Sequence, residues 1–290
     1  MQSLYDIPAP AKLNLFLHIT GRRADGYHLL QSVLMLIDWC DTLHFDIRAD
    51  GQISREDLTW ALPVDDLVVR AAKALQQSTG CTLGAHIGIA KSVPAQAGMG
   101  GGSSDAASTL LALNRLWKLH LSLETLSEIG LALGADVPFF LCGSHAWVEG
   151  IGEKITPMEL PSERFVVAKP DAGLQTQLIF SDPALKRDSG TAIISGFAKS
   201  PAEQIFKYGK NDLQAVAQKL CPGVTQALGW LESQGLSGRM TGSGSAVFAQ
   251  LLHDVDQDSA PAALQVKVCS NMEVHPLVGW AASDGQRRFE

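Results

Sequence analysis

The sequence places four glycines within five positions, in the segment Gly98-Met-Gly-Gly-Gly-Ser-Ser104. A short apolar run precedes these glycines, and residues with helical spacing follow them. Glycines let the backbone approach a ligand and expose its N–H groups, and a helix N-terminus carries about half a positive charge. A strand, a glycine-rich loop and a helix N-terminus in this order predict a phosphate site. The alternative is a surface turn before a helix with Ser103 or Ser104 as its N-cap.

Three familiar motifs do not fit this loop. A Walker A loop requires a lysine followed by serine or threonine, and no lysine follows these glycines. A dinucleotide fingerprint requires a third glycine where Ser103 stands. A nucleophile elbow requires a glycine two residues after its serine, but Ser103-Ser104 is followed by Asp105. Phosphate binding here therefore needs another pattern.

The loop in its wider setting, Pro94-Ala-Gln-Ala-Gly-Met-Gly-Gly-Gly-Ser-Ser-Asp-Ala-Ala107, resembles the phosphate loop of the GHMP kinases. This family is named after galactokinase, homoserine kinase, mevalonate kinase and phosphomevalonate kinase. Three further parts of the sequence resemble the family in the same order: Pro10–Leu17 with Arg23–His28, Leu133–Phe140, and Arg239–Gly244. The pair at the N-terminal end is similar to a subgroup that phosphorylates a cytidine diphosphate-linked methylerythritol.

The resemblance implies an α+β, two-domain GHMP kinase fold with the active site in the cleft between the domains. It implies an ATP-binding N-terminal domain over residues 1–155 and a C-terminal GHMP kinase domain over residues 156–290. Repeated prolines and glycines between Gly150 and Pro161 mark a plausible boundary. The implied activity is ATP-dependent phosphorylation of the substrate's 2-hydroxyl, in the methylerythritol phosphate pathway of isoprenoid precursor synthesis.

The resemblance identifies Lys12 and Asp136 as the catalytic residues. Asp136 matches a general base that takes the proton of the attacking hydroxyl, or mostly orients this hydroxyl if the transition state is loose. Lys12 matches a cation that holds Asp136 ionised and stabilises a developing alkoxide. The residues alone favour a solvated lysine on a strand edge for Lys12. They likewise favour a helix N-cap for Asp136, which lies two residues before Pro138.

The resemblance assigns the triphosphate of ATP to the glycine-rich loop, whose backbone amides would supply most of the electrostatic stabilisation. The nucleotide-binding residues implied are Pro94, Ala97, Gly98, Met99, Gly100, Gly101, Gly102, Ser103 and Ser104. Mg²⁺ should bridge phosphate oxygens, as in most phosphoryl transfer. The sequence does not identify the metal ligands, although Ser104 is a candidate.

The resemblance also implies substrate contacts from Asn14, Tyr27, His28, Thr176 and Phe180. His28 would hydrogen bond the cytosine, while Tyr27 and Phe180 would offer aromatic faces, worth about 1–3 kcal/mol per stacked base. Asn14 lies beside Lys12 on the polar face of its strand, and Thr176 would be a polar contact. The alternatives are turn residues for Tyr27 and His28 and a core residue for Phe180.

Several positions depart from the family pattern, including Gln175 and Gln177, which flank Thr176 where the family often has small residues or proline, and the loosely matching segment Cys269–Pro276. Met99 replaces the usual leucine, which conserves volume. Asp66 stands where the family usually has an asparagine near the adenine, and a carboxylate cannot donate as an amide does. The second glycine-rich turn, Thr241-Gly-Ser-Gly-Ser245, matches a segment that lies beside the phosphate loop and faces the active site.

Two other functions remain open. A GHMP kinase for another small alcohol, such as homoserine, would have little use for Tyr27, His28 and Phe180, because a small amino acid offers aromatic rings nothing to stack on. A non-catalytic nucleotide-binding sensor on the same fold would not need Lys12 and Asp136 together.

The elements that must position these residues are readable from hydrophobic periodicity. Alternation or short apolar runs predict strands over 13–19, 43–47, 86–90, 145–149, 165–169 and 246–251. Helical spacing predicts helices over 67–79, 106–117, 122–133 and 213–220, with Gly80 and Gly134 ending two of them. Mixed elements without a regular strand–helix–strand rhythm also favour an α+β fold.

Composition limits the partners. Against 30 acidic residues stand 23 Lys and Arg, so the net charge is −7, which argues against nucleic-acid or anionic-membrane binding. The five scattered cysteines form no C-x-x-C pair, and neither a secretory signal nor a membrane span is visible. We expect a cytoplasmic enzyme with a small-molecule substrate. The sequence does not distinguish a monomer from a homodimer.

Overall fold

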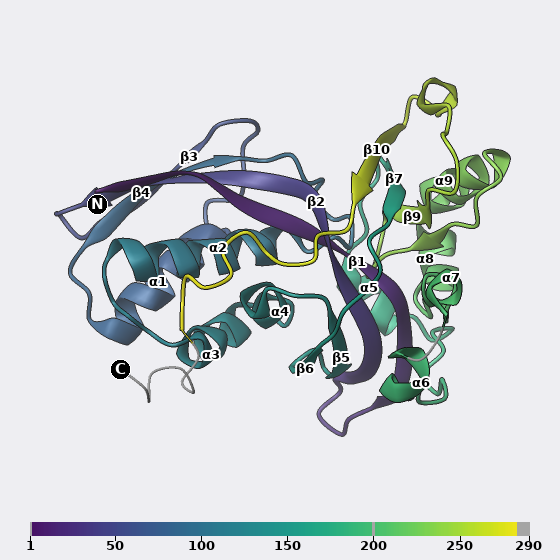
Figure 1. Cartoon of the computed structure of the whole chain (residues 1–290), viewed down its shortest axis with the longest axis horizontal. Helices are drawn as coiled ribbons and strands as arrows, with labels where there is room; N and C mark the ends of the chain where they lie inside the picture. The colour runs from purple at the N-terminus through teal and green to yellow at the C-terminus, as the bar shows by residue number, and fades with distance from the viewer. Residues whose placement is uncertain (1, 199–200, 283–290) are drawn as a thin grey trace.

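Two β-sheets organise the chain, one in each half of the sequence (Figure 1). The computed structural model describes residues 2–198 and 201–282. The first sheet has the order β3-β4-β2-β5-β6, with β1 paired to β2. Its strands are β1 (Ser3–Arg22), β2 (His28–Arg48), β3 (Ile53–Asp57), β4 (Gly84–Ala90), β5 (Ala146–Gly150) and β6 (Lys154–Pro157). The second sheet has the order β10-β7-β9-β8, made of β7 (Arg164–Pro170), β8 (Arg239–Met240), β9 (Val247–Gln250) and β10 (Leu264–Ser270).

Helices pack on both sheets, so the predicted mixture of α and β is confirmed. The first half contains α1 (Leu67–Thr79), α2 (Gly101–Leu116), α3 (Leu123–Leu133) and α4 (Val137–Cys142). The second half contains α5 (Thr176–Ser181), α6 (Ile194–Ala198), α7 (Ala202–Ile205), α8 (Gln214–Leu220), α9 (Pro222–Ser233) and a 3-10 turn at Gln257–Ser259. Within the described residues, every helix is too short or too polar to cross a bilayer.

The strands predicted over 13–19 and 43–47 belong to a long antiparallel hairpin of β1 and β2. The opposite edge of β2 pairs with β4 and β5. The pattern did not reveal residues 28–42 of β2 as a strand, because residues 33–37 are all buried. Burial of every residue removes the alternation of apolar and polar side chains that marks a half-buried strand.

Two predicted helices have the expected ends, and one does not. Helix α1 spans its predicted range and ends at Gly80, whose φ is +64°. Helix α3 ends before Gly134 and is capped at its start by the Ser122 hydroxyl. Helix α2 begins at Gly101 with Gly100 as N-cap, and no side chain caps it. The predicted capping by Ser103 or Ser104 is therefore wrong, because the left-handed turn at Gly100 starts the helix earlier.

Three clusters of buried side chains hold these layers together. The first lies between the first sheet and helices α1 to α4 and includes Phe45 and Phe139. The second joins the two halves of the chain through residues such as Trp147 and Phe165. The third lies between the second sheet and helices α8 and α9 and includes Trp230. The second cluster means that the two sheets share an apolar interface.

The segment 271–282 returns from the second sheet to the first half of the chain, as the yellow trace in Figure 1 shows. The His275 amide donates to the Gly143 carbonyl at 2.8 Å, and Leu277 lies in the first core cluster. The Leu123 amide, at the start of α3, donates to the Ala282 carbonyl at 3.0 Å. The division at residue 155 stays a prediction, and this segment is a part of 156–290 that packs on the first half.

Candidate active site

A cleft of about 1250 Å³ is lined by residues from both halves of the chain. Pockets for single small ligands usually enclose about 300–1,000 Å³, so this cleft has room for more than one ligand. All predicted site residues except Ser104 line it: Lys12, Asn14, Tyr27, His28, Pro94, Ala97, Gly98, Met99, Gly100, Gly101, Gly102, Ser103, Asp136, Thr176 and Phe180. We call residues 94–103 its glycine end, and Tyr27, His28, Thr176 and Phe180 its aromatic end.

Two glycines of the glycine end have no room for a side chain. Gly98 has a φ of +71°, and a Cβ there would collide with the Thr241 carbonyl oxygen. Gly100 has a φ of +72°, and a Cβ there would lie 2.9 Å from the Phe140 ring. Residues with side chains rarely adopt such positive φ values. Backbone atoms therefore form this wall of the cleft.

The second glycine-rich turn, residues 241–245, lies against the glycine end. The Ser245 amide donates to the Gln96 carbonyl at 3.1 Å, and the Ala246 amide donates to the Ala97 carbonyl at 3.2 Å. These bonds join two segments that are far apart in the sequence. The turn thus supports the loop from the second half of the chain and lines the cleft beside it.

The start of α2 gives the glycine end its anion-binding character. The first intrahelical bond runs from the Ser104 amide to the Gly100 carbonyl, at 2.9 Å. The amides of Gly101, Gly102 and Ser103 precede this bond, and all three residues line the cleft. Such amides and the positive end of the helix dipole favour a phosphate.

Ser104 differs from its neighbours. Its side chain is fully buried, and its hydroxyl has no hydrogen-bond partner among the described residues. It does not line the cleft. The prediction that Ser104 contacts the nucleotide or its metal therefore has no support here, because the one-residue offset from Ser103 turns its side chain into the core.

Lys12 and Asp136 come together in the cleft. The Lys12 ammonium lies 3.9 Å from the Asp136 carboxylate, which is 40% exposed. Asp136 occupies the N-cap position of α4, yet its side chain makes no capping hydrogen bond. The carboxylate instead faces the cleft and the lysine, so capping alone does not account for an aspartate at this position.

Lys12 is held in place rather than solvated, contrary to the simple strand interpretation. Its side chain is only 4% exposed, and its ammonium donates to the Asn14 side-chain oxygen. The Asn14 amide group donates in turn to the Ser32 hydroxyl at 2.8 Å. Burial lowers the pKa of Lys12, and the charge of Asp136 opposes this shift. The result is a fixed cation beside a carboxylate.

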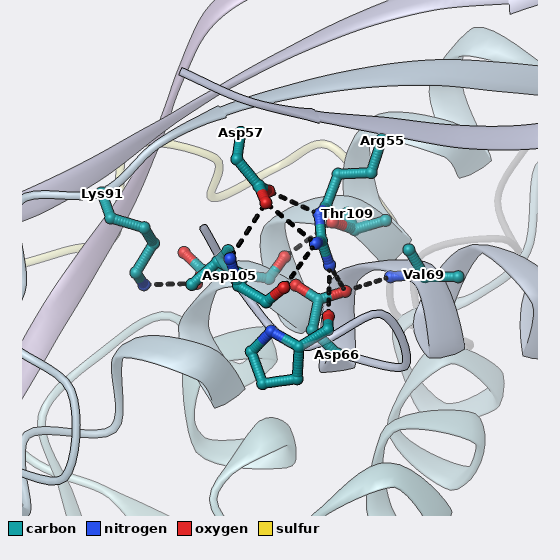
Figure 2. Close-up of polar contacts among 9 residues, drawn as sticks. Arg55, Asp57, Asp66, Val69, Lys91, Asp105 and Thr109 are labelled. Atoms are coloured by element: carbon teal, nitrogen blue, oxygen red, sulfur yellow. Dashed lines mark hydrogen bonds and ion pairs between the residues drawn. The ribbon is translucent and has the colours of Figure 1, made fainter. Parts of the chain in front are cut away.

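A buried charge cluster that the sequence interpretation missed lies under the glycine end. Lys91 donates to Asp41 and, at 2.6 Å, to Asp105 (Figure 2 shows the Lys91–Asp105 contact). Asp41 also accepts from the amides of Ser92 and Val93, at 2.6 and 2.8 Å. Asp41 and Lys91 therefore fix the backbone where β4 leads into the loop. Burial raises the pKa of Asp105 to about 8, against the opposing charge of Lys91.

Asp66, the departure from the family pattern, has partners of its own. Figure 2 shows the Arg55 guanidinium between Asp57 and Asp66, at 2.7 and 2.8 Å. Asp66 also caps α1 by accepting from the Val69 amide at 3.0 Å. Arg55 donates further to the carbonyls at positions 62 and 63. An aspartate at position 66 is therefore explained by its ion pair with Arg55, and Arg55 also orders the loop before α1.

The aromatic end is built from side chains on a hairpin turn and on α5. The rings of His28 and Phe180 lie 4.9 Å apart with 34° between their planes. Tyr27 is 60% exposed, and the Thr176 hydroxyl lies 2.7 Å from that of Ser243. Phe180 is half-buried at the cleft, so the core interpretation of Phe180 is at most partly correct.

Among the ring contacts of the described residues, Phe180 pairs with His28 and not with Tyr27. The structure therefore brings His28 and Phe180 together and leaves Tyr27 as an exposed ring at the cleft. Arg187, which no sequence signal marked, donates to the His28 ring at 3.0 Å. One indication of Lys91 was present in the sequence, because it lies between the predicted strand over 86–90 and the loop. A lysine after a strand is common, so this position alone did not identify its role.

The amides of the glycine end suit the phosphates of a nucleotide, whose oxygens would also hold magnesium. Asp136 is a carboxylate that lines the cleft; Asp105 lines it too, but its side chain is held by the Lys91 ammonium at 2.6 Å. Mg²⁺ in nucleotide sites is usually held by one or two carboxylates and by phosphate oxygens. Across residues 2–198 and 201–282, no group of three or more His, Cys, Asp or Glu side chains could hold a metal without a ligand's help.

Comparison with known families identifies two matching regions. Residues 66–144 match the GHMP kinases N terminal domain, and residues 191–273 match the GHMP kinases C terminal domain. The first region contains the glycine end and Asp136. The second contains the 241–245 turn and most of the second sheet. Both halves of the chain thus match one family in order.

Full-length relatives share most of the sequence. The 4-diphosphocytidyl-2-C-methyl-D-erythritol kinase of Albidiferax ferrireducens is 74% identical over 284 residues, which cover 98% of each chain. The enzyme of the same name from an Acidovorax species is 68% identical and covers 97% of this chain and 99% of its own.

Solved structures agree with this similarity. A crystal structure of a 4-(cytidine 5'-diphospho)-2C-methyl-D-erythritol kinase superposes with a TM-score of 0.76 at 30% identity, covering 93% of this chain and 98% of its own. A homoserine kinase from Cytophaga hutchinsonii superposes with a TM-score of 0.69 at 15% identity, covering 95% and 96%. The second likeness shows the fold alone.

Proposed function

Because the chain belongs to the GHMP kinase family and has its two-domain fold, we propose that it phosphorylates the 2-hydroxyl of 4-diphosphocytidyl-2-C-methyl-D-erythritol with ATP. The activity belongs to the methylerythritol phosphate route to isoprenoid precursors. Relatives that carry this enzyme name match nearly the whole chain. Membership of the family makes the protein an ATP-dependent phosphotransferase, and the aromatic end supports the choice of acceptor.

One observation carries the proposal: a single cleft contains a backbone-built phosphate site, a lysine–carboxylate pair and an aromatic pair. A nucleotide triphosphate at the glycine end and a cytidyl group at the aromatic end would use the whole volume. Homoserine would leave His28 and Phe180 without a partner. The presence of an aromatic pair beside the phosphate site and the lysine–carboxylate pair favours an acceptor that is itself a nucleotide.

Asp136 and Lys12 would act on the acceptor hydroxyl. The Asp136 carboxylate is partly exposed in the cleft, so it can accept the proton of that hydroxyl or orient its lone pair toward the γ-phosphorus. Lys12, fixed by Asn14, supports the ionised form of Asp136 and the negative charge that develops on the hydroxyl oxygen. The amides at the start of α2 stabilise charge on the phosphates.

Mg²⁺ at the glycine end would be held mainly by phosphate oxygens, because Asp105 is engaged by Lys91 and Asp136 is assigned to the acceptor hydroxyl. The ion would neutralise charge on the β- and γ-phosphates. The protein's own contribution is to fix the loop, through Asp41, Lys91 and the 241–245 turn. Asp66, which lines the cleft and is held by Arg55, would border the adenine side.

A coupled ADP-release assay tests the proposal directly. Purified protein is supplied with ATP, Mg²⁺ and one of three acceptors: the cytidyl methylerythritol, homoserine or mevalonate. We expect kcat/KM for the cytidyl acceptor to exceed the others by at least about a hundredfold. ADP release with homoserine alone would show another GHMP kinase, and no release with any acceptor would favour a nucleotide-binding sensor.

Location and assembly are part of the same proposal. We expect the enzyme in the cytoplasm, where ATP is available, and without a nucleic-acid partner because the net charge is −7. The cleft is lined by residues from both halves of one chain, and we expect either a monomer or a homodimer. Light scattering of the purified protein would give the mass in solution.

A further inference from the structure

The guanidinium of Arg187 joins the two segments that form the aromatic end. Its Nε donates to His28 Nε2 at 3.0 Å. One terminal nitrogen donates to the carbonyls of Phe180 and Asp182, at 3.1 and 2.9 Å, and the other donates to the Leu185 carbonyl at 3.0 Å. A single side chain thus connects the start of β2 with the end of α5. Arg187 itself lies outside the cleft lining.

This contact decides which nitrogen of His28 carries the proton. An arginine has only donors and does not lose its proton in proteins, so His28 Nε2 must be the acceptor. In a neutral imidazole the remaining nitrogen, Nδ1, then carries the hydrogen. The tautomer is assigned from this hydrogen bond. His28 lines the cleft, and the ring nitrogen that Arg187 does not bind is therefore a donor and not an acceptor.

The surroundings also keep His28 neutral. A proton on Nε2 would set two donors against each other and place two positive charges in contact. Burial lowers the pKa of His28, and the charges of Arg187 and Arg22 lower it further. Arg22 is held nearby by the Gly26 carbonyl at 3.1 Å.

We propose that Arg187 is a positioning residue that determines base specificity: it fixes His28 as an Nδ1–H donor and holds its ring against Phe180. The ligand class is a pyrimidine nucleotide whose base presents an acceptor on its pairing edge. This inference rests on the proposed function, since it concerns the base of the same acceptor substrate.

The chemistry of the base explains why the tautomer matters. Cytosine has acceptors at N3 and O2, whereas N3 of uracil carries a hydrogen and is a donor. O2 accepts in both bases, so the discrimination arises at N3, where a fixed Nδ1–H pairs with cytosine but opposes the uracil N3–H. A histidine free to exchange tautomers could pair with either base. Arg187 would therefore contribute selectivity for cytosine as well as affinity.

The first test is a spectrum of the intact enzyme. Nuclear magnetic resonance of protein with isotopically labelled histidine nitrogens distinguishes protonated from unprotonated ring nitrogens, and a His28→Asn variant assigns the signals. We expect wild-type His28 to be protonated on Nδ1 and unprotonated on Nε2 at neutral pH. A wild-type His28 protonated on Nε2 would overturn the proposal without any variant of Arg187.

The second test compares Arg187→Met with Lys186→Met, which removes the same charge from an exposed neighbour. We expect Arg187→Met to give mixed His28 tautomers and to weaken cytidine diphosphate binding by at least about tenfold, measured by calorimetry. KM for the cytidyl acceptor should rise similarly, with kcat within about threefold of wild type and ATP affinity unchanged. Lys186→Met should match wild type.

Unchanged tautomers or unchanged cytidine diphosphate affinity in Arg187→Met would overturn the inference. Equal losses of cytidine and uridine diphosphate affinity would reduce Arg187 to a support for the ring stack and would overturn its role in specificity. If the wild-type enzyme binds cytidine diphosphate with the expected tautomer but releases no ADP, the proposed kinase substrate is wrong and the inference stands. Arg187→Lys, which keeps a positively charged donor group but only one nitrogen, should restore part of the tautomer preference.

Discussion

Backbone atoms form most of the glycine end of the cleft, whereas side chains on a turn and a six-residue helix form the aromatic end. The glycine end is fixed from several sides, by the 241–245 turn, by Asp41 and by the buried Lys91. The aromatic end has exposed residues, and Arg187 is its main connection between the two segments.

The difference follows the chemistry that each end would recognise. A phosphate can be bound by amides, which every residue carries, once glycines remove the side chains from the approach. A base must be recognised by stacking and by donors in particular directions, which only side chains supply. The comparison therefore predicts different failures when each end is altered.

The largest effect is expected between the two ends, at the acceptor hydroxyl. Asp136→Asn keeps the shape of the side chain but cannot accept a proton, so kcat should fall by about 10²–10⁴. ATP and cytidine diphosphate affinities, measured by calorimetry, should stay within about threefold of wild type because neither end is changed. A kcat near that of wild type would remove Asp136 from its proposed role.

A methyl group in the glycine end should come next. Gly98→Ala combines a positive φ with a collision against the Thr241 carbonyl, so kcat/KM for ATP should fall at least about tenfold. Gly80→Ala is the matched control, because Gly80 has a φ of +64° but open space around a Cβ. It should lower the free energy of unfolding by about 1–2 kcal/mol and leave the KM for ATP unchanged. An equal kcat/KM for ATP in both variants would contradict a collision between the new methyl group at position 98 and the Thr241 carbonyl.

A substitution in the aromatic end should weaken binding of the cytidyl acceptor and leave kcat unchanged. Phe180→Ala removes the ring beside His28, so KM for the cytidyl acceptor should rise about tenfold, within the range of one lost stack. Leu178→Ala, on the same helix but outside the cleft lining, is the control and should leave the KM unchanged. Steady-state kinetics with saturating ATP separates the two. A fall in kcat with constant KM would mean that the ring serves the reaction rather than binding.

The smallest effect concerns the buried Asp105 below the glycine end and the pH dependence of the free energy of unfolding. Burial raises the pKa of Asp105 to about 8, so the folded protein holds a proton that the unfolded chain releases near pH 4. Stability from this group is therefore lost as the pH rises from about 4 to 8. Asp105→Asn should remove this loss, which is at least about 1 kcal/mol between pH 5 and 8.5. Urea unfolding at both pH values measures it, and parallel changes in the two proteins would contradict the assignment.

The same contrast explains what the sequence could and could not predict. The close spacing of the glycines at positions 98 and 100–102 is itself the signal for a phosphate loop. The loop, the helix after it and its anion-binding character were therefore predictable. Lys12 and Asp136 required the resemblance, because each alone also fits an ordinary strand or cap. The strand over 28–42 was missed because its central residues, 31–37, are buried on both faces.

Arg187 and Asp41 could not be identified from the sequence, since their roles depend on partners more than fifty positions away. The N-cap of α2 was placed too late because capping preference favours serine over glycine, whereas the local turn at Gly100 decides the start. Local chemistry was thus readable in the sequence, and contacts between distant segments were not.

The returning segment 271–282 has a consequence for how this protein is made. During synthesis the first sheet and helices α1 to α4 leave the ribosome well before this segment. Leu277, which is 3% exposed, and Trp280, which lies 4.5 Å from the Arg115 guanidinium, are then missing from the core they complete. The first half exposes that apolar surface until this segment is available to cover it. Folding of the first sheet and helices α1 to α4 therefore depends on residues more than a hundred positions later in the chain.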